Sequence, residues 1–456
     1  MDKNRVAFLS LGCKVNSYET DAIEKQFREA GYTVVDFNKA ADVYVINTCS
    51  VTNMADRKSR QMISKARKTN NDAIVVATGC YVQTADEDKI KSELKIDIAV
   101  GNNKKGSVLE AVNAYIESGN RQINIININE KCEYEDTPIS DTLENTRAYI
   151  KIQDGCNQFC SYCIIPYARG RIRSREKQSI IEEVNALVSN GYKEVVVTGI
   201  HLSSYGLDFK EDTFEMKDYC PFRYEYLLDV LMEINKINGI ERIRLGSLEP
   251  RIITDEFLAG LKQVTKLCPH FHLSLQSGCD DTLKRMNRKY NSEKYMESLN
   301  LLRKYYENPA ITTDVIVGFP METEEEFEKT KGFLSKCNFS MMHIFKYSRR
   351  KGTVADRMDG QVDEQIKSAR SHKLLELSQV LNRKYCEEYV GQNLEVLFEE
   401  MVTIENKTYF SGHTTNYIKV LVPTEGYAED KLKNCIKLVN LEGFMEENTL
   451  IGKWIN

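Results

Sequence analysis

Strand-like and helix-like segments alternate along most of this chain, and this alternation restricts the fold more than any other feature of the sequence. In the first part, apolar runs at 6–9, 43–46 and 73–77 are separated by amphipathic stretches at 17–30 and 54–68. Such β-α-β repetition predicts an open, mostly parallel sheet with helices on its faces. We therefore expect an α/β amino-terminal domain over residues 1–117.

The same alternation resumes after a polar linker at 118–146 and continues to residue 388. Strand-like runs that end in small or polar groups lie at 148–152, 195–199, 242–245, 271–275 and 312–317. A (β/α) barrel carries its site at the carboxyl ends of its strands. Residues 147–388 therefore predict a second domain built as a partial or full (β/α) barrel.

Short alternating stretches replace the helical pattern in the last segment, residues 389–456. They lie at 394–398, 407–410, 418–422 and 435–439. Turn-separated stretches of this length predict a small antiparallel β-barrel as the third domain.

The cysteine content indicates metal or redox chemistry. The chain holds 13 cysteines, and no apolar run approaches the roughly 18 residues that cross a bilayer. Because the first residues also lack the pattern of a signal peptide, we expect a cytoplasmic protein with no membrane contact. Disulfides are rare in that reducing compartment. The net charge of −5 does not indicate an RNA partner, so local charge has to decide that question.

Three of these cysteines, Cys156, Cys160 and Cys163, lie within one short loop at the spacing C-x3-C-x2-C. A cubane [4Fe–4S] cluster has four irons, so three thiolates leave one iron open to a small molecule. Zinc is the alternative, but a closed zinc site needs four ligands and commonly takes two of them from a C-x2-C pair. Only Cys160 and Cys163 have that spacing, so we expect a cluster-binding loop.

Three further cysteines each follow a predicted strand of the first domain: Cys13, Cys49 and Cys80. The carboxyl ends of parallel strands meet at one edge of a sheet, where such folds build their sites. We therefore expect a second metal site there. The alternative is that these cysteines are ordinary buried residues.

The loop sequence GCNQFCSYCIIPYARGRIRSR, at 155–175, resembles the cluster loop of radical S-adenosylmethionine (SAM) enzymes. More narrowly, it is similar to that of the methylthiotransferases that modify tRNA or a ribosomal protein. The resemblance implies that the loop cysteines are catalytic, holding a [4Fe–4S] cluster that binds SAM and cleaves it to a 5′-deoxyadenosyl radical. GCKVNSYET, NTCSVT and ATGC resemble the amino-terminal domain of these enzymes, in which three cysteines hold an auxiliary [4Fe–4S] cluster.

The resemblance also implies which residues contact SAM at the ends of the barrel strands. These are Tyr162, Thr198, Gly199, Gln276 and Gly318. The chain departs from the family where GFPGET is usual, because Met321 stands in place of the second glycine. Methionine adopts positive φ less readily than glycine, so we expect this loop to approach the cofactor differently.

Several motifs are similar to the branch that acts on threonylcarbamoyladenosine beside the tRNA anticodon: GCKVNSYET, RLGSLEP and HLSLQSGCDDTLKRMNRKY. The branch that acts on isopentenyladenosine usually reads GCQMN and HLPVQSG, and the ribosomal-protein branch differs at the same places. The implied reaction replaces the hydrogen on carbon 2 of the adenine by a methylthio group, using two molecules of SAM. It further implies a sulfur donor and an electron donor as partners.

Two regions are candidates for RNA contact. The stretch GHTTNYIKV at 412–420 resembles the TRAM domain, an RNA-binding barrel in which Tyr417 would stack on unpaired bases; a protein-contact role is the alternative. Basic residues crowd 57–68, where a solvated helix face is equally consistent. Four alternating arginines after the cluster loop fit phosphate contacts: Arg169, Arg171, Arg173 and Arg175.

Two rivals from other classes remain, a non-enzymatic iron–sulfur RNA-binding protein and a zinc-structured scaffold. Among enzymes, specificity for isopentenyladenosine is the nearest alternative. Four histidines, at 201, 270, 272 and 343, read as packed or hydrogen-bonded residues and not as catalytic bases, because no paired carboxylate is visible in the sequence.

Overall fold

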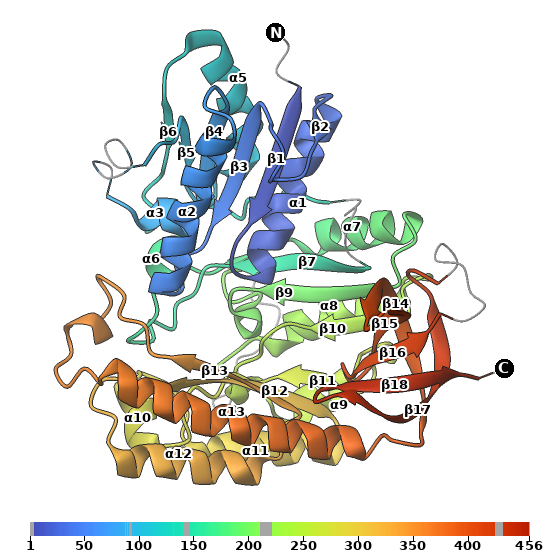
Figure 1. Ribbon diagram of the computed structural model, residues 1–456. Helices are drawn as coiled ribbons and strands as arrows, with labels where there is room; N and C mark the ends of the chain where they lie inside the picture. The colour runs from blue at the N-terminus through green and yellow to red at the C-terminus, as the bar shows by residue number, and fades with distance from the viewer. Residues whose placement is uncertain are drawn as a thin grey trace.

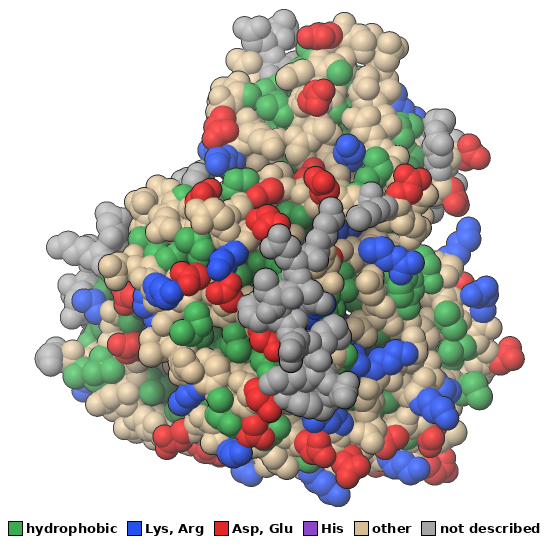
Figure 2. All heavy atoms as spheres, turned by 180° about the vertical axis from the view of Figure 1, so that it is seen from behind, with side chains coloured by type: hydrophobic (Ala, Val, Ile, Leu, Met, Phe, Trp, Pro, Cys, Tyr) green, Lys and Arg blue, Asp and Glu red, His purple; other side chains and the backbone are tan. Residues whose placement is uncertain are grey.

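The computed structural model describes residues 4–86, 88, 90, 94–130, 132–139, 146–209, 221–424 and 432–455. They form three parts, which are an amino-terminal lobe, a central partial barrel and a small closed barrel (Figure 1). Seen from behind, the amino-terminal lobe stands as a narrower mass on the wider body formed by the rest of the chain (Figure 2). Acidic and basic side chains are interspersed along the lower edge of that face.

The amino-terminal lobe is a six-stranded sheet of order β2-β1-β3-β4-β5-β6, in which every pairing is parallel. Its strands are β1 Arg5–Ser10, β2 Thr33–Val34, β3 Val43–Thr48, β4 Ile74–Gly79, β5 Ile98–Val100 and β6 Gln122–Asn124. Its helices are α1 Lys14–Glu29, α2 Asn53–Thr69, α3 Cys80–Thr84 and α5 Val108–Ser118, with a 3-10 turn, η1, at Lys105–Ser107. Every residue of β3 and β4 is buried, because helices cover both faces of the sheet. The predicted parallel α/β sheet is confirmed.

The central part is a partial barrel made of two short sheets, β10-β9-β7-β8 and β11-β12-β13. Its strands are β7 Arg147–Asp154, β8 Arg173–Ser174, β9 Glu194–Gly199, β10 Arg242–Leu245, β11 His270–His272, β12 Ala310–Val317 and β13 Met341–Lys346. The Leu248–Leu273 bridge joins the two sheets, whereas no described pairing joins β8 to β13. The prediction of a partial barrel is therefore confirmed.

Helices pack on the outside of this barrel, with α10 to α13 along its lower side in Figure 1. The helices of the central part are α6 Ile165–Arg169, α7 Lys177–Ser189, α8 Tyr224–Lys236, α9 Asp255–Leu261, α10 Asp280–Arg285, α11 Ser292–Tyr305, α12 Glu324–Cys337 and α13 Glu364–Glu387. Three 3-10 turns lie between them, η2 Leu202–Ser204, η3 Pro250–Ile252 and η4 Ala355–Arg357. α12 begins with a capping box, since Thr323 and Glu326 each bond to the other's backbone N–H.

The carboxyl-terminal part is a closed barrel of order β14-β15-β16-β18-β17. Its strands are β14 Asn393–Ile404, β15 Lys407–Thr414, β16 Lys419–Pro423, β17 Ile436–Glu446 and β18 Thr449–Trp454. The predicted small antiparallel barrel is confirmed, with one exception in its pairing. β16 and β18 run parallel, and β18 was not predicted.

The amino-terminal lobe covers the side of the partial barrel between β7 and the segment after β13. α1 lies beside β7 (Figure 1). On the other side, Arg350 donates to Ser50 at 2.7 Å and pairs with Asp56 at 2.8 Å. No described helix is long and apolar enough to cross a bilayer.

Candidate functional site

The loop triad consists of Cys156, Cys160 and Cys163. It follows β7 directly and turns at Gly155, whose φ is +71°. A Cβ on Gly155 would lie 1.8 Å from the carbonyl oxygen of Arg171, so only glycine fits. The Cys156 N–H then donates to the carbonyl of Gly170 at 3.0 Å and closes the loop.

The loop thiols are buried close to one another. Burial is the main cause that raises the pKa of Cys156 to about 11, and Cys160 adds to it. Burial, Cys160 and Cys156 together raise the pKa of Cys163. These thiols keep their protons near neutral pH until a metal displaces them. Arg288 brings a positive charge next to this loop, since its Nη1 lies 3.2 Å from Cys160 Sγ.

The strand-end triad consists of Cys13, Cys49 and Cys80. These residues follow β1, β3 and β4, so the sheet brings them to its carboxyl edge from three distant segments. Burial raises the pKa of Cys49 to about 11, and Cys80 and Cys13 are close enough to add to it. Gly12 leaves room for this approach, because a Cβ there would lie 2.6 Å from Cys49 Sγ.

The donor sets of both triads fit iron–sulfur clusters better than single zinc ions. A zinc ion with Zn–S bonds of about 2.3 Å would hold its sulfurs about 4 Å apart. Among the residues that the structure describes, the groups of three possible ligands within 4.8 Å of one another include neither triad. All-thiolate sets with wider spacing suit a cluster of several irons. The three-thiolate sets expected from the sequence are therefore compatible with clusters, and their metal binding stays a prediction.

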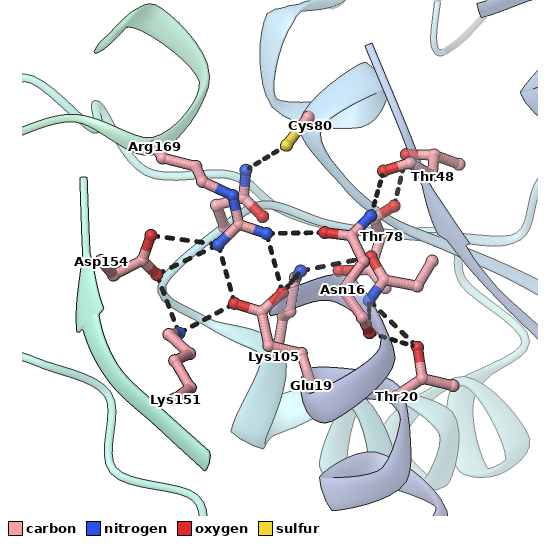
Figure 3. Close-up of polar contacts among 12 residues, drawn as sticks. Asn16, Glu19, Thr20, Thr48, Thr78, Cys80, Lys105, Lys151, Asp154 and Arg169 are labelled. Atoms are coloured by element: carbon pink, nitrogen blue, oxygen red, sulfur yellow. Dashed lines mark hydrogen bonds and ion pairs between the residues drawn. The ribbon is translucent and has the colours of Figure 1, made fainter. Parts of the chain in front are cut away.

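A buried charge network lies beside Cys80 of the strand-end triad (Figure 3). Arg169, at the end of α6, donates to Glu19 of α1 at 2.8 and 2.9 Å and to Asp154 of β7 at 3.0 and 3.2 Å. Lys151 pairs with both carboxylates at 2.8 Å. Lys105 pairs with Glu19 from the η1 turn. The network therefore joins the amino-terminal lobe to the partial barrel.

The network carries excess positive charge beside the strand-end triad. Two carboxylates face Arg169, Lys105 and Lys151, and the more distant Arg173 lies 3.6 Å from Asp154. Burial raises the pKa of Cys13, and Arg169 opposes that effect without reversing it. Asn102 donates to Cys80 Sγ at 3.5 Å and to the carbonyl of Ala168 at 2.7 Å, which ties this thiol to the segment that carries Arg169. Such a field stabilises thiolates.

The burial of this network corrects one prediction. Arg169, Arg173 and Arg175 were expected to contact RNA phosphates, but at most 3 % of each is exposed. Arg175 pairs with Glu183 and with Asp136, the latter at 2.8 Å. The alternation of the arginines does not reveal this burial, because the sequence does not show which carboxylates will face them. Only Arg171 of the four is exposed.

The residues implied to contact SAM lie at the carboxyl ends of the barrel strands or within the cluster loop. Thr198 and Gly199 end β9, Gly318 follows β12, and Gln276 bridges to Val315 with a φ of +75°. The ring of Tyr162 packs edge-on against Phe319, with 6.4 Å between the ring centroids. Their contact with SAM stays a prediction.

One buried group at the same rim, Glu249, was missed in the sequence, and His201 was interpreted there only as a packed or hydrogen-bonded residue. Glu249 pairs with Arg251 at 2.8 Å through Oε1, while Oε2 has no partner among the described residues. His201 Nδ1 lies 2.6 Å from Ser204 Oγ, and its Nε2 has no described partner either. Burial is the main cause that lowers the pKa of His201 to about 3, so this ring is neutral. Polar residues after strand-like runs could have identified both.

Met321 adopts the glycine-like conformation that its residue type disfavours. Its φ is +64°, and its N–H donates to the carbonyl of Gly360 at 2.8 Å. Glu322 then accepts from the Gly318 N–H at 2.6 Å and pairs with Arg370 at 2.8 Å. Met321 therefore takes a glycine-like φ, and the way in which this loop approaches the cofactor stays a prediction.

The ring of Tyr417 is packed against the protein, which corrects its predicted role in base stacking. His413 stacks on it with 4.6 Å between centroids, and the guanidinium groups of Arg147 and Arg244 lie 5.0 and 4.8 Å from its centroid. Arg244 also donates to the carbonyl of Thr415 at 2.9 Å. Tyr417 therefore anchors the small barrel to the partial barrel.

Of the four histidines singled out in the sequence, His272 has a carboxylate partner that the sequence does not reveal. His272 Nε2 lies 3.3 Å from Asp314 Oδ2, and its Nδ1 lies 2.9 Å from Thr312 Oγ1. The residues come from neighbouring strands, β11 and β12, 40 positions or more apart. His272 is thus hydrogen-bonded, as expected, and the carboxylate beside it comes from a strand that the sequence alone does not place next to it.

Comparisons with known proteins match two parts of the chain to family models. A family model described as the radical SAM superfamily matches residues 150–334, and one described as the uncharacterized protein family UPF0004 matches residues 5–101. Among solved structures, the radical SAM methyltransferase TsrM from Kitasatospora setae has a TM-score of 0.54 at 16 % identity, over 76 % of this chain and 75 % of that one. That likeness concerns the fold.

Three relatives extend over nearly the whole chain. Threonylcarbamoyladenosine tRNA methylthiotransferase MtaB of Bacillus subtilis is 45 % identical over 91 % of this chain and 90 % of its own length. The protein of the same name from Aquifex aeolicus is 40 % identical over 93 % and 98 %. The tRNA-2-methylthio-N(6)-dimethylallyladenosine synthase of Clostridium novyi is 35 % identical over 87 % and 86 %.

Proposed function

This chain belongs to the radical SAM methylthiotransferases that modify tRNA, and we propose that it converts N(6)-threonylcarbamoyladenosine next to the anticodon into its 2-methylthio derivative. The observation that carries the proposal is the identity of 45 % over 91 % of the chain to a relative named for that reaction. Identity to the relative named for dimethylallyladenosine is 35 %, which makes that substrate the second candidate.

SAM and two [4Fe–4S] clusters are the cofactors of this enzyme class. We assign one cluster to the loop triad and the other to the strand-end triad, since each offers three thiolates and no other ligand type. When bound, these cofactors supply homolytic chemistry, which an acid–base pair cannot perform on an unactivated C–H bond. Arg288 holds Cys160, and Arg169 keeps positive charge beside Cys13 and Cys80.

The rim of the partial barrel would hold SAM through groups that lack a partner in the protein. The free Oε2 of Glu249 suits the ammonium group of the methionyl moiety, and neighbouring Arg251 suits its carboxylate. The neutral ring of His201 offers its unpartnered Nε2 to a hydroxyl or a ring nitrogen. Unpartnered buried polar atoms of this kind mark a site that a polar ligand completes.

Phosphate contacts are assigned to the outer face of α2. The sequence left two roles open for residues 57–68, RNA contact and a solvated helix face, and the exposure of these side chains fits either role. Five exposed basic side chains lie on this helix: Arg57, Lys58, Arg60, Lys65 and Lys68. Together with Arg171 they replace the buried arginines as the candidate surface for the tRNA backbone.

The reaction also needs an electron donor and a sulfur donor, and we place it in the cytoplasm with its tRNA substrate. The described cysteines are all free thiols, as a reducing compartment requires.

The test uses reconstituted protein, SAM and a chemical reductant with two anticodon stem-loops. One carries threonylcarbamoyladenosine, the other isopentenyladenosine, and the nucleosides are analysed by mass spectrometry. We expect the 2-methylthio product from the first stem-loop. Product from the second alone would establish the alternative specificity, and the absence of both product and 5′-deoxyadenosine would establish a non-enzymatic protein.

A further inference from the structure

A cavity of about 510 Å³ lies where the three parts of the molecule meet. Its walls come from the first turn of α1, from the interior-facing residues of β10 to β13, and from the loop of the small barrel around Tyr417. Cavities of this size hold small ligands or substituents. It adjoins the strand-end triad, because Lys14, which lines the cavity, follows Cys13 directly in the chain.

Lys14 is an ammonium group without a partner. It is exposed, lines the cavity and makes no hydrogen bond or ion pair with any described residue. Of the other cations nearby, Arg244 pairs with Glu194 at 2.8 Å and Arg147 pairs with Glu399 at 3.2 Å, whereas Lys419 in the wall has no described partner either. The cavity therefore contains a positive charge that the protein itself does not neutralise.

Two further features make the same region receptive to an anion. Lys14 occupies the first position of α1, where the helix dipole is positive and where acidic residues are normally preferred. The helix has no side-chain cap, so its first N–H groups add to the positive field. His270, only 8 % exposed, lines the cavity with an Nδ1 that has no described partner.

The cavity also offers hydrogen-bonding groups beside the cation. Asp314 and His343 lie on β12 and β13, and with His272 they form a cluster whose ligand atoms are within 4.8 Å of one another. Two histidines and a carboxylate are a set that a divalent metal can use. The free charge of Lys14 and the guanidinium of Arg244 in the same cavity disfavour a dication, so an anionic ligand with a hydroxyl group fits better.

We propose that this cavity binds the threonyl end of the substrate, with Lys14 taking its carboxylate and the His272–Asp314 pair taking its hydroxyl group. The inference rests on the proposed function, and it assigns substrate specificity to a named site. In the adenine ring, carbon 2 and carbon 6, which carries the substituted amine, lie on either side of one ring nitrogen. A substituent held beside Lys14 therefore keeps carbon 2 close to the triad that contains Cys13. An apolar dimethylallyl group has no carboxylate, so it forgoes the charge-assisted hydrogen bond to Lys14 that the threonyl group makes.

The test measures binding of a fluorescent anticodon stem-loop to the reconstituted protein by anisotropy. Each variant is measured with threonylcarbamoyladenosine and with its methyl ester, which lacks only the charge. A hydrogen bond to a charged group predicts that wild type binds the acid about tenfold or more tighter than the ester. Lys14→Gln should abolish that preference and Lys14→Arg should keep part of it. Lys336→Gln, the same change on the outer helix α12, should behave as wild type.

Iron content and the visible spectrum of each variant show whether the clusters have been retained. Misfolding of a variant is therefore not mistaken for a specific loss of binding. If Lys14→Gln keeps the full preference for the acid while wild type methylthiolates this stem-loop, the inference is overturned and the proposed function stands. If wild type neither prefers nor methylthiolates threonylcarbamoyladenosine, the proposed function fails and the inference fails with it.

Discussion

Substituting Glu19 by Gln tests whether the buried network holds the amino-terminal lobe against the partial barrel. Glu19 accepts from Arg169 and Lys151 at 2.8 Å and pairs with Lys105, and only 5 % of it is exposed. The amide keeps the volume but removes the charge, which leaves three buried cations facing Asp154 alone. Removing one partner of a buried ion pair costs about 3–5 kcal/mol.

Hydrogen–deuterium exchange of α1 and β7 under native conditions measures this cost. Because 1.4 kcal/mol is a factor of ten, amides protected by the contact should exchange about a hundred- to a few thousand-fold faster in Glu19→Gln. Glu24→Gln on the same helix is the matched control, since Glu24 pairs with the half-exposed Arg28 at 2.6 Å. Its loss should cost about 0.5 kcal/mol or less. Equal effects of the two substitutions would refute the role assigned to the network.

Three further predictions concern acid stability, the Met321 loop and the small barrel. Burial raises the pKa of Glu19, but Arg169 and the two lysines outweigh it and hold that pKa well below its usual range. The contact between the lobe and the partial barrel should therefore be stable above pH about 4.5 and weaken as the pH falls further. Thermal melts between pH 3 and 8 would show this loss, which should be smaller in Glu19→Gln. Met321→Gly should raise the melting temperature by the equivalent of about 1 kcal/mol because it removes left-handed strain, whereas Met321→Ala should not. Tyr417→Ala should lower the melting temperature through lost packing against Arg147 and Arg244. Affinity for a stem-loop with unmodified adenosine, which places no substituent in the cavity that Tyr417 lines, should remain within about threefold if the ring stacks on no base.

The architecture could be predicted because it follows from local periodicity. The buried strand β3 reads as an apolar run, and the amphipathic stretch after Cys49 became α2. The cysteines of the strand-end triad could be grouped because the sheet topology alone puts the ends of parallel strands together. β18 escaped notice since its six residues include a glycine and two polar groups.

Partnerships between distant residues could not be predicted in the same way. Arg169 and Glu19 are 150 positions apart, so nothing near Arg169 in the sequence indicates that its charge is buried. Tyr417 reads as a stacking residue until Arg147 and Arg244 are seen beside its ring. Charge runs and lone aromatic residues therefore predict a surface role only when no complementary group comes from elsewhere in the fold.

The account depends most on two separate triads, each of which holds a cluster. Mössbauer spectroscopy and iron analysis of protein reconstituted with iron-57 test this directly, comparing wild type with variants in which one triad at a time is replaced by alanine. Each variant should keep about half the iron of wild type, all of it as [4Fe–4S]. If either variant keeps the full iron content, or if wild type holds zinc in place of iron, the assignment of the triads is wrong.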